Sequence, residues 1–492
     1  MFYIRKDDLM ISLRELAGIM RATSLIMLMP ILATFYYAGS REPLSILQDA
    51  LAFIAPSLLL HILSHLFKRI KAVGESKTKH IMLTVALTWL IIGIIGTVPF
   101  LMRGILNPVD SLFESMSGWT TTGYSMIRDF ENTPKDILLY RGISQGAGGL
   151  GIISLGIMVL FYGGKTGVGY VDMGVHKIKS GIRSTISEIW KIYLFYIFIG
   201  AILLYLAGMT PFDAINHSMT ALATGGFSTH SSIGYFNSFW VELVLVLLML
   251  AGGTSFLLHY RIFNKDWKAL LNSMEAKFMY ALIIIATIII SISIYGKNIP
   301  GVNTHSIKDV VWKTIFHIVA GMSTAGFNTI DFGRWPEIAQ SILMLLMYVG
   351  SMAGSTSGGI RVIRFVIMAK SISYGLKKLV LPKTAILRMK VDDRIVEERE
   401  LIDVIGYSVL YFLTAFVGAM LMMFLGYTAV QSLFTILSAM ANDGLGIVSG
   451  TIWYNMPWQG KMVTTFFMWI GRIEIYPLLL IIKNLIDKTH YK

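Results

Sequence analysis

Four short polar turns, each centred on a glycine, carry the residues of this chain whose types and spacing could do chemistry. The turns are Thr121-Thr122-Gly123-Tyr124-Ser125, Thr224-Gly225-Gly226-Phe227-Ser228, Thr324-Ala325-Gly326-Phe327-Asn328 and Asn442-Asp443-Gly444-Leu445-Gly446. Their central glycines are 103, 100 and 118 residues apart, and His217 and His317 each precede theirs by nine positions. This common register indicates a fourfold internal repeat.

The backbone oxygens of such turns could bind a cation. Glycine permits positive φ angles and close approach of strands, and carbonyl oxygens turned toward an axis can replace the hydration shell of an ion. We expect four bulky residues to pack behind the strands: Tyr124, Phe227, Phe327 and Leu445. We also expect Asp443 to add a formal charge at the mouth of the ring. The residues predicted to form the ring and bind the ion are Thr121, Thr122, Gly123, Thr224, Gly225, Gly226, Thr324, Ala325, Gly326, Asn442, Asp443 and Gly444.

A short helix is predicted before each turn, over residues 109–119, 212–223, 308–323 and 428–441. These helices would extend roughly 16 to 24 Å, less than the ~30 Å hydrocarbon core, so they would enter the membrane and return. Their partially negative C-terminal ends would favour a cation at the axis. Asp110 and Asp213, each two residues after a proline, are predicted helix starts, and His217 and His317 are expected to tie the helices to the scaffold.

The composition places the whole chain in a membrane. Of its 492 residues 55% are hydrophobic and only 14% charged, and the mean hydropathy of +0.65 excludes a soluble globular enzyme. The absence of cysteine excludes disulfides, thiolate metal sites and iron–sulfur clusters. The apolar runs predict ten spans, near residues 18–38, 50–67, 80–101, 138–162, 187–208, 237–260, 277–296, 337–369, 403–426 and 461–482.

The basic residues orient these spans. An even number of spans puts both termini on one side, and 31 of the 42 Lys and Arg residues then lie on that side. Ten lie on the other side, among them Arg141, and Arg472 lies within the last span. The positive-inside rule therefore predicts cytoplasmic termini, and the net charge of +13 reflects topology rather than nucleic-acid binding.

The predicted fold is an all-α polytopic membrane protein. Four covalently linked repeats of span, short helix and span surround a central pseudo-fourfold pore, and two extra spans precede them. The predicted units are a two-span addition (1–79), repeat one (80–175), repeat two (176–270), repeat three with a broken second span (271–375), a cytoplasmic connector (376–402) and repeat four (403–492).

Two features of the spans suggest a gate. Residues 350–359 hold four glycines and four hydroxyl residues, which favour a broken helix that lines a cavity, although a seam of closely packed helices has the same composition. Arg472 is a charge in mid-span and thus a functional candidate, with Glu474 as its candidate partner, although that pair could be purely structural. The predicted gate residues are Gly350, Gly354, Ser355, Thr356, Ser357, Gly358, Gly359 and Arg472.

The four turns, TTTGYS, ATGGFS, STAGFN and NDGLG, resemble those of the Trk/Ktr/HKT superfamily of potassium transporters, over nearly the whole chain. The two leading spans make the chain similar to the Trk-type membrane subunit in particular. The resemblance implies that the central glycines line a selectivity filter, that a glycine at position 123 goes with potassium preference, that residues 350–359 close the pore and that Arg472 faces it. The fourth turn departs from the family, whose members often carry Asn-Val-Gly-Pro-Gly there.

The resemblance also implies partners. Relatives assemble as homodimers on a cytoplasmic ring of nucleotide-binding regulatory subunits, and no such domain is recognisable in this chain. No cofactor is expected, and potassium would be the substrate. The mixed charges of residues 370–402 could dock a soluble partner or remain solvated, and both interpretations stay open.

Potassium uptake across the plasma membrane, gated by the intramembrane loop and regulated from the cytoplasm, is the predicted function. One alternative is a sodium/potassium-coupled or less selective monovalent cation transporter. A remote alternative is a membrane-embedded enzyme, although the sequence holds no paired catalytic aspartates and no metal motif. An alternating-access transporter with inverted repeats is disfavoured because each predicted repeat begins and ends inside.

Overall fold

A computed structural model describes residues 6–72, 74, 76–162, 182–382, 387–392, 394–448 and 450–479. Within these ranges all regular secondary structure is helical apart from one two-stranded hairpin. The predicted cytoplasmic C-terminus beyond residue 479, the linker between the first two repeats and part of the connector lie outside the described residues.

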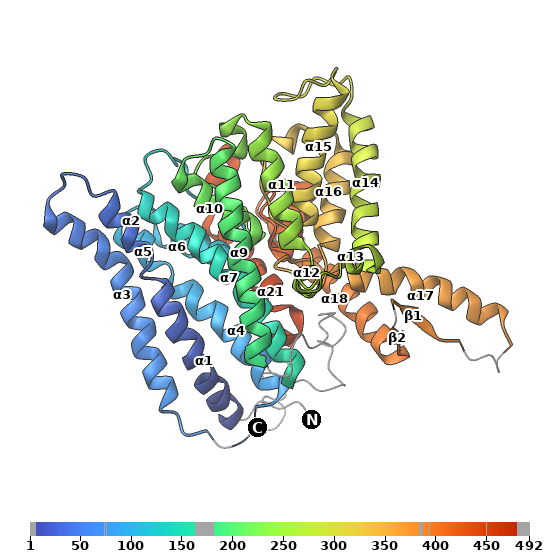
Figure 1. Ribbon diagram of the computed structural model, residues 1–492, viewed down its shortest axis with the longest axis horizontal. Helices are drawn as coiled ribbons and strands as arrows, with labels where there is room; N and C mark the ends of the chain where they lie inside the picture. The colour runs from blue at the N-terminus through green and yellow to red at the C-terminus, as the bar shows by residue number, and fades with distance from the viewer. Residues whose placement is uncertain are drawn as a thin grey trace.

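A helical hairpin precedes the repeats. Helices α1 (Lys6–Ile26) and α2 (Ile31–Tyr36) form one apolar segment, and α3 (Pro43–Lys68) returns along α1 (Figure 1). Helix α1 also packs on α4, the first span of the first repeat. The hairpin is therefore attached to one side of the remaining structure.

Four units of span, short helix and span follow. Short accessory helices are α5 (Val98–Met102), α12 (Phe256–Phe263), α13 (Lys268–Asn272), α20 (Gly450–Tyr454), η2 (Ile233–Phe236) and η3 (Phe332–Arg334). The four units are α4 (Thr78–Ile95), α6 (Pro108–Trp119) and α7 (Lys135–Tyr162); α9 (Ile182–Leu206), α10 (Pro211–Leu222) and α11 (Phe239–Gly253); α14 (Met274–Ile294), α15 (Ile307–Met322) and α16 (Glu337–Val349); and α18 (Glu398–Phe424), α19 (Ala429–Ala441) and α21 (Trp458–Ile473).

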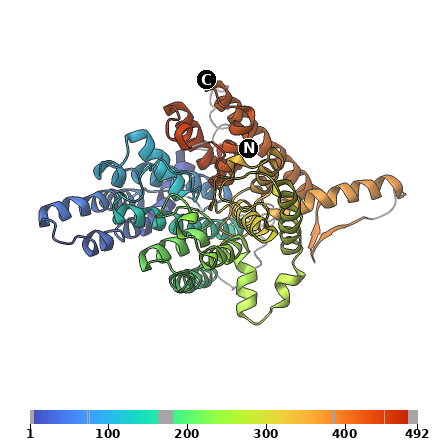
Figure 2. The ribbon, with the colours of Figure 1, turned by 90° about the horizontal axis from the view of Figure 1, so that it is seen from above.

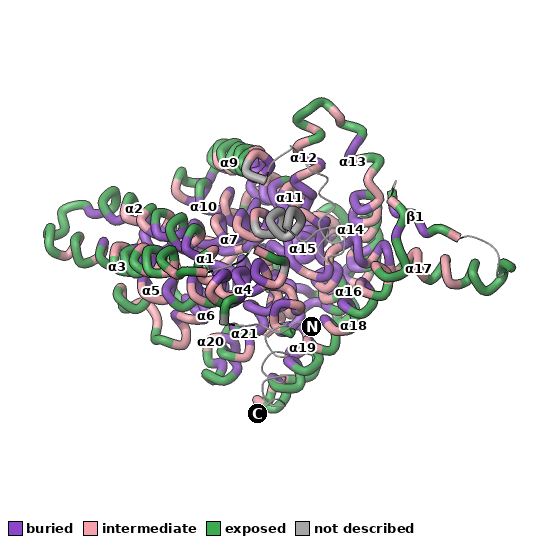
Figure 3. Tube along the Cα trace, turned by 90° about the horizontal axis from the view of Figure 1, so that it is seen from below, coloured by how far each residue is buried: buried purple, intermediate pink, exposed green. Residues whose placement is uncertain are grey.

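The four units close into a cycle. The second span of each unit contacts the short helix of the next: α7 contacts α10, α11 contacts α15, α16 contacts α19, and α21 returns to α6. Seen from above, the chain passes around a centre from its cyan part through green and yellow to red (Figure 2). The buried residues gather at that centre, whereas α3 and α9 at the periphery are largely exposed (Figure 3).

Six described helical segments are long and apolar enough to cross a membrane, and α11 with α12 would make a seventh. The span predicted near 237–260 is broken, because α11 and α12 meet at 103°. The break is satisfied by the loop after α16: the amide of Phe256 donates to the carbonyl oxygen of Gly354 (3.0 Å), and the carbonyl of Gly253 accepts from Met352 (3.2 Å). The last span is also interrupted, at Glu474, whose φ is +61°.

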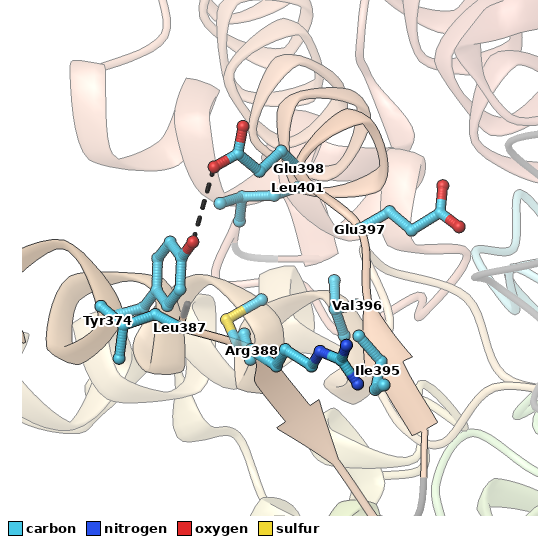
Figure 4. Close-up of a pocket in the computed structure, with 9 residues that line it drawn as sticks. Tyr374, Leu387, Arg388, Ile395, Val396, Glu397, Glu398 and Leu401 are labelled. Carbon is cyan, nitrogen blue, oxygen red and sulfur yellow. Dashed lines mark hydrogen bonds between the residues drawn. The ribbon is translucent and has the colours of Figure 1, made fainter. Parts of the chain in front are cut away.

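An arm extends from the body, and it includes the end of the predicted third repeat as well as the predicted connector. It consists of α17 (Val362–Val380) and strands β1 (Met389–Val391) and β2 (Arg394–Val396), paired antiparallel (Figure 1). A cavity of about 310 Å³ lies between α17, the hairpin and the start of α18, where the Tyr374 hydroxyl donates to Glu398 at 3.5 Å (Figure 4). Lys378 also pairs with Glu398 at 3.0 Å, so some of the mixed charge in this region is paired internally.

Candidate functional site

The four short helices begin with the same cap. In each, a side-chain oxygen of the residue just before the helix accepts a hydrogen bond from the amide of the third helical residue. The acceptor and donor residues are Asn107 and Asp110 (3.0 Å), Thr210 and Asp213 (3.2 Å), Ser306 and Asp309 (3.4 Å), and Thr428 and Gln431 (3.3 Å). The helices therefore start where the sequence predicted, but Asp110 and Asp213 are third residues rather than caps.

The helices also end alike. Just past the C-terminal end of each short helix, one residue has a left-handed backbone conformation. The φ angles are 56° at Thr121, 51° at Thr224, 56° at Thr324 and 53° at Asn442. The next amide closes a bond to a carbonyl five residues earlier, at 2.8 to 2.9 Å in all four units. A β-branched residue rarely adopts positive φ. The backbone is therefore strained at the three threonines, and the surrounding structure must hold it in this conformation.

The central glycines then form a ring. A β carbon added to Gly123 would overlap the carbonyl oxygen of Gly225, the residue before the central glycine of the next turn. The same relation joins Gly226 to Ala325, Gly326 to Asp443 and Gly444 to Thr122. Because the fourth contact returns to the first strand, the four turns surround one axis. The structure thus brings all twelve predicted ring residues together.

Exposure distinguishes the central glycines from their neighbours. Gly123, Gly226, Gly326 and Gly444 are partly exposed, whereas the residues immediately before and after each are buried. Solvent therefore reaches the ring at the central glycines. The φ angles of these glycines, 71° to 91°, need a residue without a β carbon.

The side chains behind the ring hold it in place. The bulky residues predicted to pack there are buried, and the Tyr124 hydroxyl donates to the carbonyl oxygen of Leu445 at 2.8 Å. His217 bonds the carbonyl of Asp213 at 2.8 Å and the hydroxyl of Ser228 at 2.9 Å. His317 accepts from the amide of Thr329 at 3.4 Å. Both histidines thus tie a short helix to the segment after its turn, as expected.

Asp443 differs from its prediction. Its side chain is fully buried, Oδ1 accepts the amide of Leu445 at 3.1 Å, and Oδ2 has no hydrogen-bond partner. The main-chain carbonyl of Asp443, rather than its carboxylate, lies against Gly326. The carboxylate expected at the mouth of the ring is instead buried, because it bonds the amide of its own turn.

The loop between α16 and α17 contacts three of the four strands. The Thr356 hydroxyl donates to the carbonyl of Leu222 (2.9 Å) and accepts from Thr224 (3.2 Å), and the amide of Gly358 donates to Thr324 (2.8 Å). A β carbon on Gly358 would overlap the carbonyl of Ala441, just before the fourth turn. Gly350, Gly354 and Gly359 have positive φ, so this segment is a broken helix and not a helical seam.

Arg472 bonds this loop instead of Glu474. Its Nη1 donates to the carbonyl of Thr356 at 3.2 Å, and its Nη2 donates to the carbonyl of Gly148 at 2.9 Å. Glu474 accepts from Arg364 at 3.2 Å. The predicted Arg472–Glu474 pair is wrong, because α21 ends at Ile473 and the positive φ of Glu474 redirects the chain.

Sequence reasoning missed a polar network behind the first two strands. Arg141 and Glu114 form a buried ion pair at 2.7 Å, and Arg141 also donates to the carbonyl of Ser228 at 2.8 Å. Gln145, one helical turn further along α7, bonds the second turn directly. The available signal was a cation and an amide spaced four residues apart within an apolar run.

A model of the TrkH family, described as a cation transport protein, matches residues 48–490. The chain belongs to the TrkH family. It is 33% identical to an uncharacterized cation transporter of Methanocaldococcus jannaschii over 99% of this chain and 98% of that protein. It is 31% identical to the Trk system potassium uptake protein TrkH of Escherichia coli K12, over 84% of this chain and 86% of that protein.

The fold agrees with a solved family member. The crystal structure of the potassium transporter TrkH from Vibrio parahaemolyticus matches with a TM-score of 0.82 and 28% identity, covering 97% of this chain and 98% of that one. The Trk-type resemblance and the all-α polytopic fold are confirmed. Since the TrkH family consists of cation transporters, the chain is a multi-pass membrane transporter, and the hypothesis of a membrane enzyme was wrong.

Proposed function

We propose that this TrkH-family chain takes up potassium through the ring of four turns, which acts as its selectivity filter. The observation that carries the proposal is the closed cycle of contacts from each central glycine to the carbonyl before the next. Carbonyl oxygens held on one axis can replace the water around a monovalent cation. The relatives from Escherichia coli and Vibrio parahaemolyticus are named as potassium transporters, which supports potassium as the substrate.

The loop of residues 350–359 is the proposed gate. Its contacts engage the hydroxyls of Thr224 and Thr324, the strained residues at the inner ends of two strands. The Thr224 hydroxyl donates to Thr356 and the Thr324 hydroxyl accepts the amide of Gly358, so the loop is held directly against both strands. Opening would withdraw the loop and break its bond to Arg472.

The arm of α17 and the β hairpin is the proposed place of cytoplasmic regulation. It leaves the body beyond the gate loop and is continuous with it, so a force on α17 acts directly on residues 350–359 (Figure 1). A separate nucleotide-binding ring, a homodimeric assembly, a plasma-membrane location and cytoplasmic termini complete the proposal. The excess of basic residues on one side supports this orientation.

Rubidium uptake by the reconstituted chain tests the function. Liposomes loaded with potassium and carrying the purified protein should take up radioactive rubidium, and external potassium should compete far better than sodium. A Thr356→Val variant, whose loop has lost its hydroxyl bonds, should do so without any cytoplasmic partner. Uptake at the level of empty liposomes from both proteins would contradict potassium transport.

A further inference from the structure

Gly225 is a ring residue without a side chain, and a side chain from another helix fills the space beside it. A β carbon built on Gly225 would collide with the side-chain amide of Gln145. Gln145 lies on α7, the second span of the first unit, and is fully buried. Its amide therefore occupies the space in which a side chain of the second strand would lie.

The amide of Gln145 bonds the strand at two consecutive peptide groups. Nε2 donates to the carbonyl oxygen of Gly225 at 2.6 Å, and Oε1 accepts the amide of Phe227 at 2.9 Å. These groups lie on either side of the central glycine, Gly226. The carbonyl of Gly225 is also the oxygen that faces Gly123 in the ring. A carbonyl has two lone pairs, so it can accept from Gln145 and still face the axis.

The fourth strand makes one of these two hydrogen bonds with a side chain of its own. Asp443 occupies the position equivalent to Gly225, and its Oδ1 accepts the amide of Leu445 at 3.1 Å, as Oε1 of Gln145 accepts that of Phe227. The order of contacts in the ring places the second and fourth strands opposite each other. Two opposite strands are thus held by a side-chain oxygen behind the same backbone amide.

We propose that Gln145 is a positioning residue of the filter, which holds the carbonyl of Gly225 at the distance from the axis that favours potassium over sodium. The inference rests on the proposed function. Gly225 cannot hold its own peptide because it has no side chain, and glycine permits the strand to rotate away. A flexible strand would adapt to the smaller sodium ion, whereas a strand fixed at two peptide groups would not.

Sodium competition against rubidium uptake measures this role. Gln145→Met keeps the buried volume but removes both hydrogen bonds, and should lower the preference for rubidium over sodium by about tenfold. The matched control is Gln340→Met, which removes another buried glutamine, whose amide donates to the carbonyls of Gly333 and Trp335. The control should keep the preference of the original chain.

A reciprocal pair of substitutions separates positioning from folding. Gly225→Asn alone should impair the protein, because its side chain would overlap Gln145. The double variant Gln145→Ala, Gly225→Asn has room for the new amide, which can accept from Phe227 as Asp443 accepts from Leu445. It should recover selectivity toward that of the original chain, a coupling that only interacting positions show.

The outcomes are distinguishable. If the original chain carries no rubidium or does not prefer it to sodium, the proposed function fails and this inference with it. If the original chain is selective and Gln145→Met is equally selective, the inference alone is overturned. If Gln145→Met does not fold, the double variant decides: selective uptake supports the role of Gln145, and uptake without preference overturns it.

Discussion

The guanidinium of Arg472 donates a hydrogen bond of 3.2 Å to the carbonyl oxygen of Thr356, in the loop that contacts the ring. The second terminal nitrogen of Arg472 donates to Gly148 on α7 at 2.9 Å. One buried side chain thus joins the loop of the third unit to the second span of the first unit. The loop cannot leave its position without breaking a charge-assisted bond.

Replacement of Arg472 by alanine should raise rubidium uptake in the absence of any partner. The variant loses the bond to the loop at Thr356, the bond to Gly148 on α7 and a buried positive charge, so we expect an increase of about tenfold. Glu474→Gln is the control, because Glu474 bonds Arg364 and not Arg472. An equal increase from Glu474→Gln would mean that the two residues act as a pair.

Replacement of Thr356 by valine should also raise basal uptake. Valine keeps the shape of threonine but loses the bonds from the hydroxyl to the carbonyls of Leu222 and Gly252, at 2.9 and 3.0 Å. Because a hydroxyl has a single proton, the two carbonyls share one donated bond, and its loss, about 1.4 kcal/mol, corresponds to roughly a tenfold shift toward an open loop. Thr414→Val, which removes a bond within α18, should leave uptake unchanged. Unaltered uptake in Thr356→Val would argue against this loop as the gate.

Replacement of Gly123 by serine should reduce the preference for potassium over sodium by about tenfold, or about 1.4 kcal/mol. The added β carbon would overlap the carbonyl of Gly225 at a φ of 91°, so the ring must widen. Gly208→Ser is the control: its φ is 109°, but no atom lies within 4 Å of the added β carbon. Sodium competition should change only in the first variant, and a preserved preference there would contradict a ring in direct contact with the ion.

Replacement of Arg141 by methionine should destabilise the protein. It leaves the fully buried Glu114 without its cation, and breaking a buried pair costs about 3–5 kcal/mol. Thermal unfolding in detergent should occur at a clearly lower temperature. Lys191→Met removes an exposed partner of Glu188 and should change little. Equal unfolding temperatures for both variants would mean that the Arg141 pair does not stabilise the outer side of the ring.

The repeat was predictable from the sequence because each unit needs the same backbone. A turn with two positive φ angles requires glycine at one position and tolerates few residues at the other, so Gly123 and its equivalents recur in register. The short helices were predictable because they are too brief to span and end at these turns. Local conformational demands of this kind leave a trace in residue type.

Contacts between residues that are far apart in the sequence could not be predicted in this way. Glu474 lies two residues after Arg472, and proximity in sequence favoured them as a pair, but a positive φ at Glu474 sends them apart. The break in the sixth span depends on Gly354, about a hundred residues away, which accepts the freed amide of Phe256. The spacing of Arg141 and Gln145 marks them as polar residues in an apolar helix, but it does not show that Gln145 contacts a strand of another unit.

The most direct test of the account is the position of bound ions in a crystal of the protein grown with rubidium. Anomalous density should lie on the axis between the carbonyl oxygens that precede Gly123, Gly226, Gly326 and Gly444. An ordered ring without ion density, together with rubidium bound elsewhere in the protein, would contradict the central claim.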